Sequence, residues 1–177
     1  MRLNRRHVLA GMALTASPLR AGGIVPSAAD MARAVSAPRD ATPLDIKDEN
    51  GMPISLAEWR GRWVLLNLWA PWCLPCRREM PSLMRLSTAL DPANAVVLPL
   101  AFERRGPIWV HKFYREEGIT GLPVLLGDGK NVDRVLGLSN LPTTALINPE
   151  GQHVQTVAGE AVWDDVATLA WLGELTG

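Results

Sequence analysis

The chain has 177 residues, of which 47% are hydrophobic and 20% are charged, which is ordinary for a globular domain with its own core. Its 18 basic residues balance its 18 acidic residues, so the formal net charge at pH 7 is zero. This balance excludes the strongly basic surface that nucleic-acid-binding proteins present, and we expect no nucleic-acid partner.

The N-terminal segment has the layout of an export signal. The sequence "MRLNRRHVLAGMALTASPLRAGG" opens with basic residues, continues with a short apolar stretch over residues 8–16 and ends in small residues. The adjacent Arg5 and Arg6, closely followed by apolar residues, resemble a twin-arginine signal, with a Sec-type signal as the alternative. We therefore expect a periplasmic protein, which an uncleaved signal would tether to the membrane. The expected organisation is a signal over residues 1–29, a linker or weak helix over 30–41 and one domain over 42–177.

Strand signals and helix signals alternate after residue 42. Two short strands should flank the Asn50-Gly51 turn, and the capping-box pattern from Ser55 to Glu58 should start one helical turn. The nearly continuous apolar run over residues 63–69 predicts a strand that is buried on both faces.

A helix is expected from about residue 73 to residue 90, because its apolar residues recur at helical spacing, and Pro81 should kink or split it. Strands are expected over residues 95–102, 122–126 and 143–148, with helices over 107–118 and 132–136 between them. A hairpin then leads into a closing helix with Trp163, Val166, Leu169 and Leu172 on one side. This order predicts a mixed sheet flanked by helices.

Both cysteines of the chain, Cys73 and Cys76, stand where the buried strand turns into the helix. A structural disulfide is a poor explanation, because so small a loop contributes little chain entropy. A structural zinc site needs four ligands, and the chain has only three histidines to add, one of them in the signal. A two-thiolate copper(I) site remains an alternative.

A reactive pair explains the position of the cysteines best. Cys73 would lie at the helix N-terminus, where free N–H groups and the helix dipole stabilise a thiolate, the nucleophilic form. Cys76 would lie one turn further along on the same face, where it can close the disulfide. Pro75 presets φ for a first helical turn and needs no partner for an N–H.

The surrounding motifs extend this interpretation to a family. The segment "NLWAPWCLPCRREMPSL" resembles the active-site segment of the thioredoxin superfamily, and most closely its exported TlpA/ResA-type branch. "LSNLPTTALIN" resembles the loop that carries the family's cis-proline, and "AGEAVWD" the segment before the last helix. The resemblance runs from about residue 40 to residue 177. It implies an α/β, thioredoxin-like fold with an N-terminal β-hairpin, a central insertion and a mixed sheet flanked by helices.

The resemblance also implies roles for individual residues. Glu79, three positions after Cys76, would be the acid beneath the disulfide, and the alternative is a solvated helix glutamate. Pro142 would be the cis-proline, with Leu141 offering its backbone to an extended substrate segment, and Trp72 would cover the nucleophile. Asn67 stands where ordinary thioredoxins carry a buried aspartate. His111 and His153 are expected as surface or rim residues, and Arg104 and Arg105 in a solvated turn, with a role in partner docking as the alternative.

We expect an exported thiol–disulfide oxidoreductase that reduces disulfides of client proteins and needs no cofactor or metal. In the family that it resembles, clients include apocytochrome c and copper-site proteins, and a membrane thiol-transfer protein supplies the electrons. We expect a monomer. The alternatives are a copper(I)-binding, metallochaperone-like module and a peroxiredoxin-like peroxidase, although the threonine of the peroxidatic motif is missing before Cys73.

Overall fold

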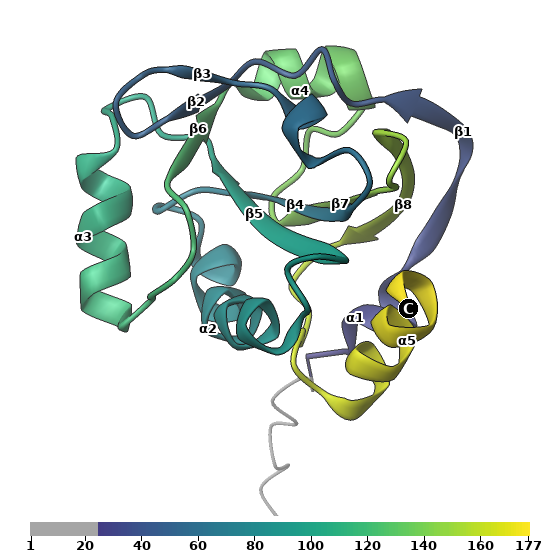
Figure 1. Ribbon diagram of the computed structural model, residues 1–177. Coiled ribbons are helices and arrows are strands. Elements are labelled where there is room, and N and C mark those ends of the chain that lie inside the picture. The colour runs from purple at the N-terminus through teal and green to yellow at the C-terminus, as the bar shows by residue number, and fades with distance from the viewer. Residues whose placement is uncertain (1–24) are drawn as a thin grey trace, which may run out of the picture.

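The computed structural model describes residues 25–177, which form an eight-stranded sheet with helices on both faces (Figure 1). The strand order is β1-β8-β7-β4-β5-β6-β2-β3. The strands are β1 (Arg33–Asp40), β2 (Ile46–Asp48), β3 (Pro53–Ile54), β4 (Trp63–Trp69), β5 (Ala95–Ala101), β6 (Leu125–Gly127), β7 (Thr143–Ile147) and β8 (Gln152–Ala158). The helices are α1 (Ala28–Met31), η1 (Leu56–Trp59), α2 (Leu74–Ala89), α3 (Ile108–Glu117), α4 (Gly129–Leu136) and α5 (Val166–Thr176).

Strand β4 is the central strand, because it pairs in parallel with β5 and antiparallel with β7. Its apolar side chains alternate between two hydrophobic cores, one on each face of the sheet. Leu65 and Trp69 face the core that includes α2, α3 and α5, whereas Leu66 and Leu68 face the core that includes η1 and α4. The expected strand buried on both faces is therefore confirmed, and so is the mixed sheet.

Helix α2 begins directly after Cys73, which is its N-cap residue. Its buried stripe includes Met80, Leu83 and Leu86, at the spacing that the sequence predicts. Pro81 lies inside the helix without splitting it, so the helix continues to Ala89. The helix therefore holds the motif cysteines and Glu79 in one rigid element.

Local turn and capping signals are also confirmed. Strands β2 and β3 form an antiparallel pair around Gly51, which has a φ of 80°. Ser55 and Glu58 form the reciprocal capping box at the start of η1.

Residues 30–41 differ from the expected linker or weak helix. Arg33–Asp40 form strand β1, which pairs antiparallel with β8 at the edge of the sheet. Its side chains are mostly exposed, so the strand lacks the alternation of apolar and polar residues that would indicate it.

The fold also includes residues that precede β1. The backbone of Ala28 donates a hydrogen bond to Val162 over 2.9 Å, and the Ala28 side chain is fully buried. The predicted signal extends to residue 29, so its last residues pack against the domain, whereas residues 1–24 lie outside the described residues. The small side chain of Ala28 permits this close packing.

The closing helix α5 begins later than expected. Asp165 is its N-cap residue, and its side chain accepts a hydrogen bond from the Thr168 N–H over 2.7 Å. Trp163 therefore precedes the helix and is buried. Val166 is 85% exposed, so the expected apolar side of this helix is wrong at that position.

Candidate active site

The two cysteines form a disulfide at the N-terminus of α2, with 5.3 Å between their Cα atoms. The Cys76 N–H donates to the Cys73 sulfur over 3.4 Å, so the helix N-terminus supplies a donor to that atom. Cys73 is 8% exposed, whereas Cys76 is fully buried. Of the two cysteines, only Cys73 therefore retains any surface in contact with solvent.

Trp72 and Trp69 have opposite environments. Trp72 is 66% exposed and stands directly before Cys73. Trp69 is fully buried, where it stacks on Tyr114 with 5.9 Å between ring centroids. The exposed indole flanks the accessible sulfur, and the buried one belongs to the core.

Pro142 lies beside the cysteine motif because of the register of the sheet. Thr143, the first residue of β7, pairs with Leu68 near the end of β4 that leads into Cys73. The Leu141–Pro142 peptide bond is cis. The side chain of Leu141 packs against the core that contains both cysteines. The segment before β7 thus lies at the same end of the strands as the disulfide.

Glu79 is buried beneath the motif rather than solvated. It is 3% exposed, and the alternative of a surface helix glutamate is therefore wrong. Burial raises the pKa of its carboxyl group from an ordinary value of 4.5 to about 7, although three hydrogen bonds to the carboxylate oppose this shift. Near neutral pH the group can therefore both accept and release a proton.

The hydrogen-bond donors of Glu79 come from distant parts of the chain. Asn67 Nδ2 donates to Oε1 over 2.8 Å, and the Ala161 N–H donates to Oε2 over 3.2 Å. Trp163 Nε1 also reaches Oε2, over 3.5 Å. No local pattern in the sequence marks Ala161 or Trp163 for this role, although both lie in "AGEAVWD", which resembles the family's segment before the last helix.

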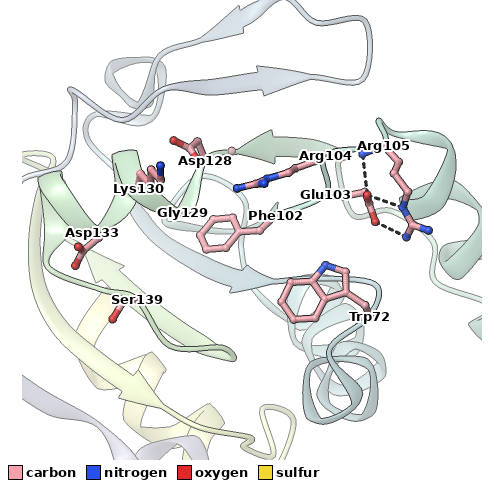
Figure 2. Close-up of a pocket in the computed structure, with 11 residues that line it drawn as sticks. Trp72, Phe102, Glu103, Arg104, Arg105, Asp128, Gly129, Lys130, Asp133 and Ser139 are labelled. Carbon is pink, nitrogen blue, oxygen red and sulfur yellow. Dashed lines mark hydrogen bonds and ion pairs between the residues drawn. The ribbon is translucent and has the colours of Figure 1, made fainter.

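A groove of about 670 Å³ opens beside Trp72 (Figure 2). Residues after β5 and residues at the start of α4 line it, and Figure 2 shows the Phe102 ring between Trp72 and Gly129. Arg105 is an ordered part of the rim, because it bonds to the buried Glu103 over 2.8 Å and lies 3.9 Å above the Trp109 ring. The predicted solvated turn is confirmed, because Arg104 and Arg105 lie in a turn after β5 and both are exposed; both also line the groove.

Among the described residues, His111 and His153 do not form a metal-binding cluster with the cysteines. Over residues 25–177, no group of three or more His, Cys, Asp and Glu side chains is placed to hold a metal ion. His111 pairs with Glu49 over 2.7 Å at the surface. His153 is buried and bonds to Thr156, so its expected surface position is wrong.

Comparison with known proteins places this site in a family. Residues 36–155 match the family model described as AhpC/TSA family. The chain is 33% identical over 146 residues to the thiol-disulfide oxidoreductase ResA of Bacillus subtilis, covering 81% of this chain and 80% of that protein. The chain belongs to the ResA/TlpA-type thioredoxin-fold family. Its Cys73–Cys76 pair is thus the redox centre of a thiol-disulfide oxidoreductase.

Solved structures support the thioredoxin-like fold of this ResA/TlpA-type protein. The thioredoxin domain of a thiol-disulfide oxidoreductase from Bacteroides vulgatus matches with a TM-score of 0.61 at 23% identity, over 81% of this chain and all of that one. The exposed lipoprotein thioredoxin of Streptococcus pneumoniae matches with a TM-score of 0.60 at 27% identity, over 73% of this chain and 97% of that one. In the described part of this chain, no helix has the length and apolar character to cross a membrane.

Proposed function

We propose that this oxidoreductase is an exported reductant of disulfides in client proteins. The contrast between the accessible Cys73 and the buried Cys76 is the observation that supports the proposal most directly. In the reduced enzyme, the Cys73 thiolate attacks a client disulfide, which forms a mixed disulfide and releases one client thiolate. Cys76 then attacks the Cys73 sulfur and releases the second client thiolate. The client gains two electrons, and the enzyme ends as the Cys73–Cys76 disulfide.

Glu79 takes part in the second half of this reaction as the proton acceptor for Cys76. The buried Cys76 thiol must lose its proton before it becomes a nucleophile, and bulk water does not reach it. The Glu79 carboxylate lies one helical turn further along and has a pKa of about 7. It therefore accepts the proton when ionised and can release it afterwards.

The client binds as an extended segment over the motif. Leu141 and Pro142 precede β7 beside the disulfide, so the Leu141 backbone is placed to align a client strand there. Trp72 offers an exposed apolar face next to Cys73. The groove beyond Trp72 then receives residues that flank the client cysteine.

The clients are exported proteins whose cysteines must be reduced before they bind haem or copper. Apocytochrome c and copper-site proteins have this requirement, and a membrane thiol-transfer protein would return the enzyme to its reduced form. The basic and apolar layout of the first residues supports export. No cofactor, metal or nucleic acid takes part in the reaction, and a monomer suffices for it.

Trapping with Cys76→Ser in the native host tests this function. The variant retains the attacking thiol but cannot resolve, so it should accumulate mixed disulfides with exported clients. Cys73→Ser is the matched control and should trap none. If Cys76→Ser captures no protein, or if Cys73→Ser captures the same proteins, the proposed reaction is wrong. Peroxide consumption that depends on Cys73, or copper bound to both thiolates in the purified protein, would instead favour the alternative functions.

A further inference from the structure

The Glu79 carboxylate is surrounded by groups that can only donate. A carboxylate has about four lone-pair positions, two on each oxygen. Within the described chain, Oε2 accepts from the Ala161 N–H over 3.2 Å and from Trp163 Nε1 over 3.5 Å. Oε1 accepts from Asn67 Nδ2 over 2.8 Å. Backbone, indole and amide N–H groups keep their protons at any pH near neutrality. One lone-pair position therefore has no donor against it, and it lies on Oε1.

The orientation of the Asn67 amide is fixed by what its nitrogen binds. Nδ2 donates one hydrogen bond to Glu79 and a second to Thr144 Oγ1, over 3.0 Å. The opposite orientation would turn Oδ1 toward Glu79, where two acceptors repel each other when Glu79 is ionised, so the ionised form of Glu79 requires the nitrogen on this side. The side chain is fully buried, and among the described residues Oδ1 has no hydrogen-bond partner. Because an unpaired buried oxygen is unfavourable and contributes no hydrogen bond, only the two bonds of Nδ2 hold the amide in this orientation.

We propose that Asn67 is the positioning residue of Glu79, anchored by Thr144, and that it directs the exchangeable proton of Glu79 to the free lone pair of Oε1. The inference deepens the proposed role of Glu79 in resolution. The proton lands on one defined atom because the other three positions face permanent donors. Loss of the amide would open a second position on Oε1 and remove a hydrogen bond that stabilises the charged form.

Other charged groups near Glu79 are few. From the segment before α5, Glu160 acts on Glu79 through its charge and disfavours ionisation. Arg78, on α2, holds Glu160 in an ion pair at the surface. On the same helix the neighbouring titratable groups are Cys73 and Cys76, which do not titrate while they form the disulfide. In the oxidised protein, the effect of Asn67 on the titration of Glu79 can therefore be measured without a contribution from the cysteines.

The test is the titration of Glu79 in the oxidised full-length protein, followed by the ¹³C chemical shift of its side-chain carboxyl carbon. Asn67→Leu removes the donor while it keeps an uncharged, buried side chain. It should raise the titration midpoint by about one pH unit, as expected for loss of a hydrogen bond to a charged group. Thr144→Val preserves shape and removes only the anchor of the amide, and it should raise the midpoint by a smaller amount. This second variant retains the test if Asn67→Leu fails to fold.

Ser82→Ala is the matched control. Ser82 Oγ accepts from the Trp163 N–H in the same buried layer, over 3.3 Å, and donates to the backbone carbonyl of Glu79, so neither bond involves the carboxylate. The control should leave the midpoint unchanged. An unchanged or lowered midpoint in the folded Asn67 and Thr144 variants, or an equal rise in Ser82→Ala, would overturn the inference. The measurement needs no client or reductant, so its failure would leave the proposed reductase reaction standing.

Discussion

Burial and hydrogen bonding act on the pKa of Glu79 in opposite directions, and burial has the larger effect. The carboxyl group therefore keeps a proton in the folded protein under conditions where a solvated glutamate would be ionised. A carboxyl group that titrates near neutral pH can accept a proton from a neighbouring thiol. In the proposed reaction, Cys73 attacks from the helix N-terminus, where free N–H groups favour a thiolate, and the buried Cys76 needs a local acceptor for its proton.

The same pKa predicts how the stability of the oxidised protein depends on pH. The folded state holds the Glu79 proton up to about pH 7, and the unfolded chain releases it near pH 4.5. Between these values the folded state binds more protons, so the free energy of unfolding falls as the pH rises. Glu79→Gln should remove this fall. Its free energy of unfolding, relative to that of the wild type, should therefore rise by up to about 3 kcal/mol between pH 4.5 and pH 7.5. Urea unfolding across this range measures the difference, and a difference that does not change with pH would contradict the assignment.

Trp72 and Trp69 give a second prediction at the residue scale. Trp72→Ala should change the free energy of unfolding by no more than about 0.5 kcal/mol, because the indole is exposed. It should slow the reduction of a protein disulfide such as insulin more than that of a small aromatic disulfide. Trp69→Ala is the matched control and should destabilise the fold by about 3–5 kcal/mol. Equal slowing of both substrates in Trp72→Ala would mean that Trp72 makes no contact with the client.

Among the secondary-structure elements, α1 and β1 bring the N-terminal segment onto the end of the molecule that carries α5. Ser27 Oγ donates to Asp165 over 3.1 Å, next to the bond by which Asp165 caps α5. Figure 1 shows α1 beside α5, with β1 leading from it to the edge of the sheet. The start of the fold thus stabilises its last helix, which in turn follows the segment that holds Glu79.

Truncation tests this contribution. A chain that starts at residue 25 retains α1 and β1, whereas a chain that starts at residue 42 loses both, together with at least two buried or half-buried hydrogen bonds to Ser27 and Ala28. The shorter chain should be less stable by at least about 2 kcal/mol, at about 1 kcal/mol for each of these hydrogen bonds, and the loss of the pairing between β1 and β8 adds to this. Equal urea midpoints for the two truncated chains would show that residues 25–41 do not contribute to the fold.

Across the whole molecule, the sheet separates two cores, and the redox centre belongs to the core that contains α2, α3 and α5. The disulfide, the segment before β7 and the groove beside Trp72 lie together at the end of β4. This arrangement exposes one sulfur and one apolar surface to a client, and it keeps the second sulfur and its acid in the interior.

Local signals in the sequence predicted much of this arrangement. Strand β4 was recognisable because burial on both faces requires a continuous apolar run, and the capping box at Ser55 is a purely local interaction. The cis bond before Pro142 followed from the family resemblance rather than from any local pattern.

Long-range contacts account for what the sequence did not predict. Strand β1 is held by its pairing with β8 and exposes most side chains, so no periodicity marks it. The Ala161 N–H that bonds to Glu79 is 82 positions away along the chain, and such a contact leaves no local pattern. Trp163 was assigned to the closing helix because its spacing fits, yet the cap at Asp165 starts that helix after it.

The proposal that Cys76 attacks after passing its proton to Glu79 makes the rate of the resolving step depend on the ionisation of Glu79. The measurement is the stopped-flow decay of a preformed mixed disulfide on Cys73, in the wild type and in Glu79→Gln. The account predicts that the wild-type rate rises as Glu79 ionises near pH 7, and that the variant is slower by about 100-fold or more and lacks this rise. Equal rates and equal pH profiles for the two proteins would contradict it.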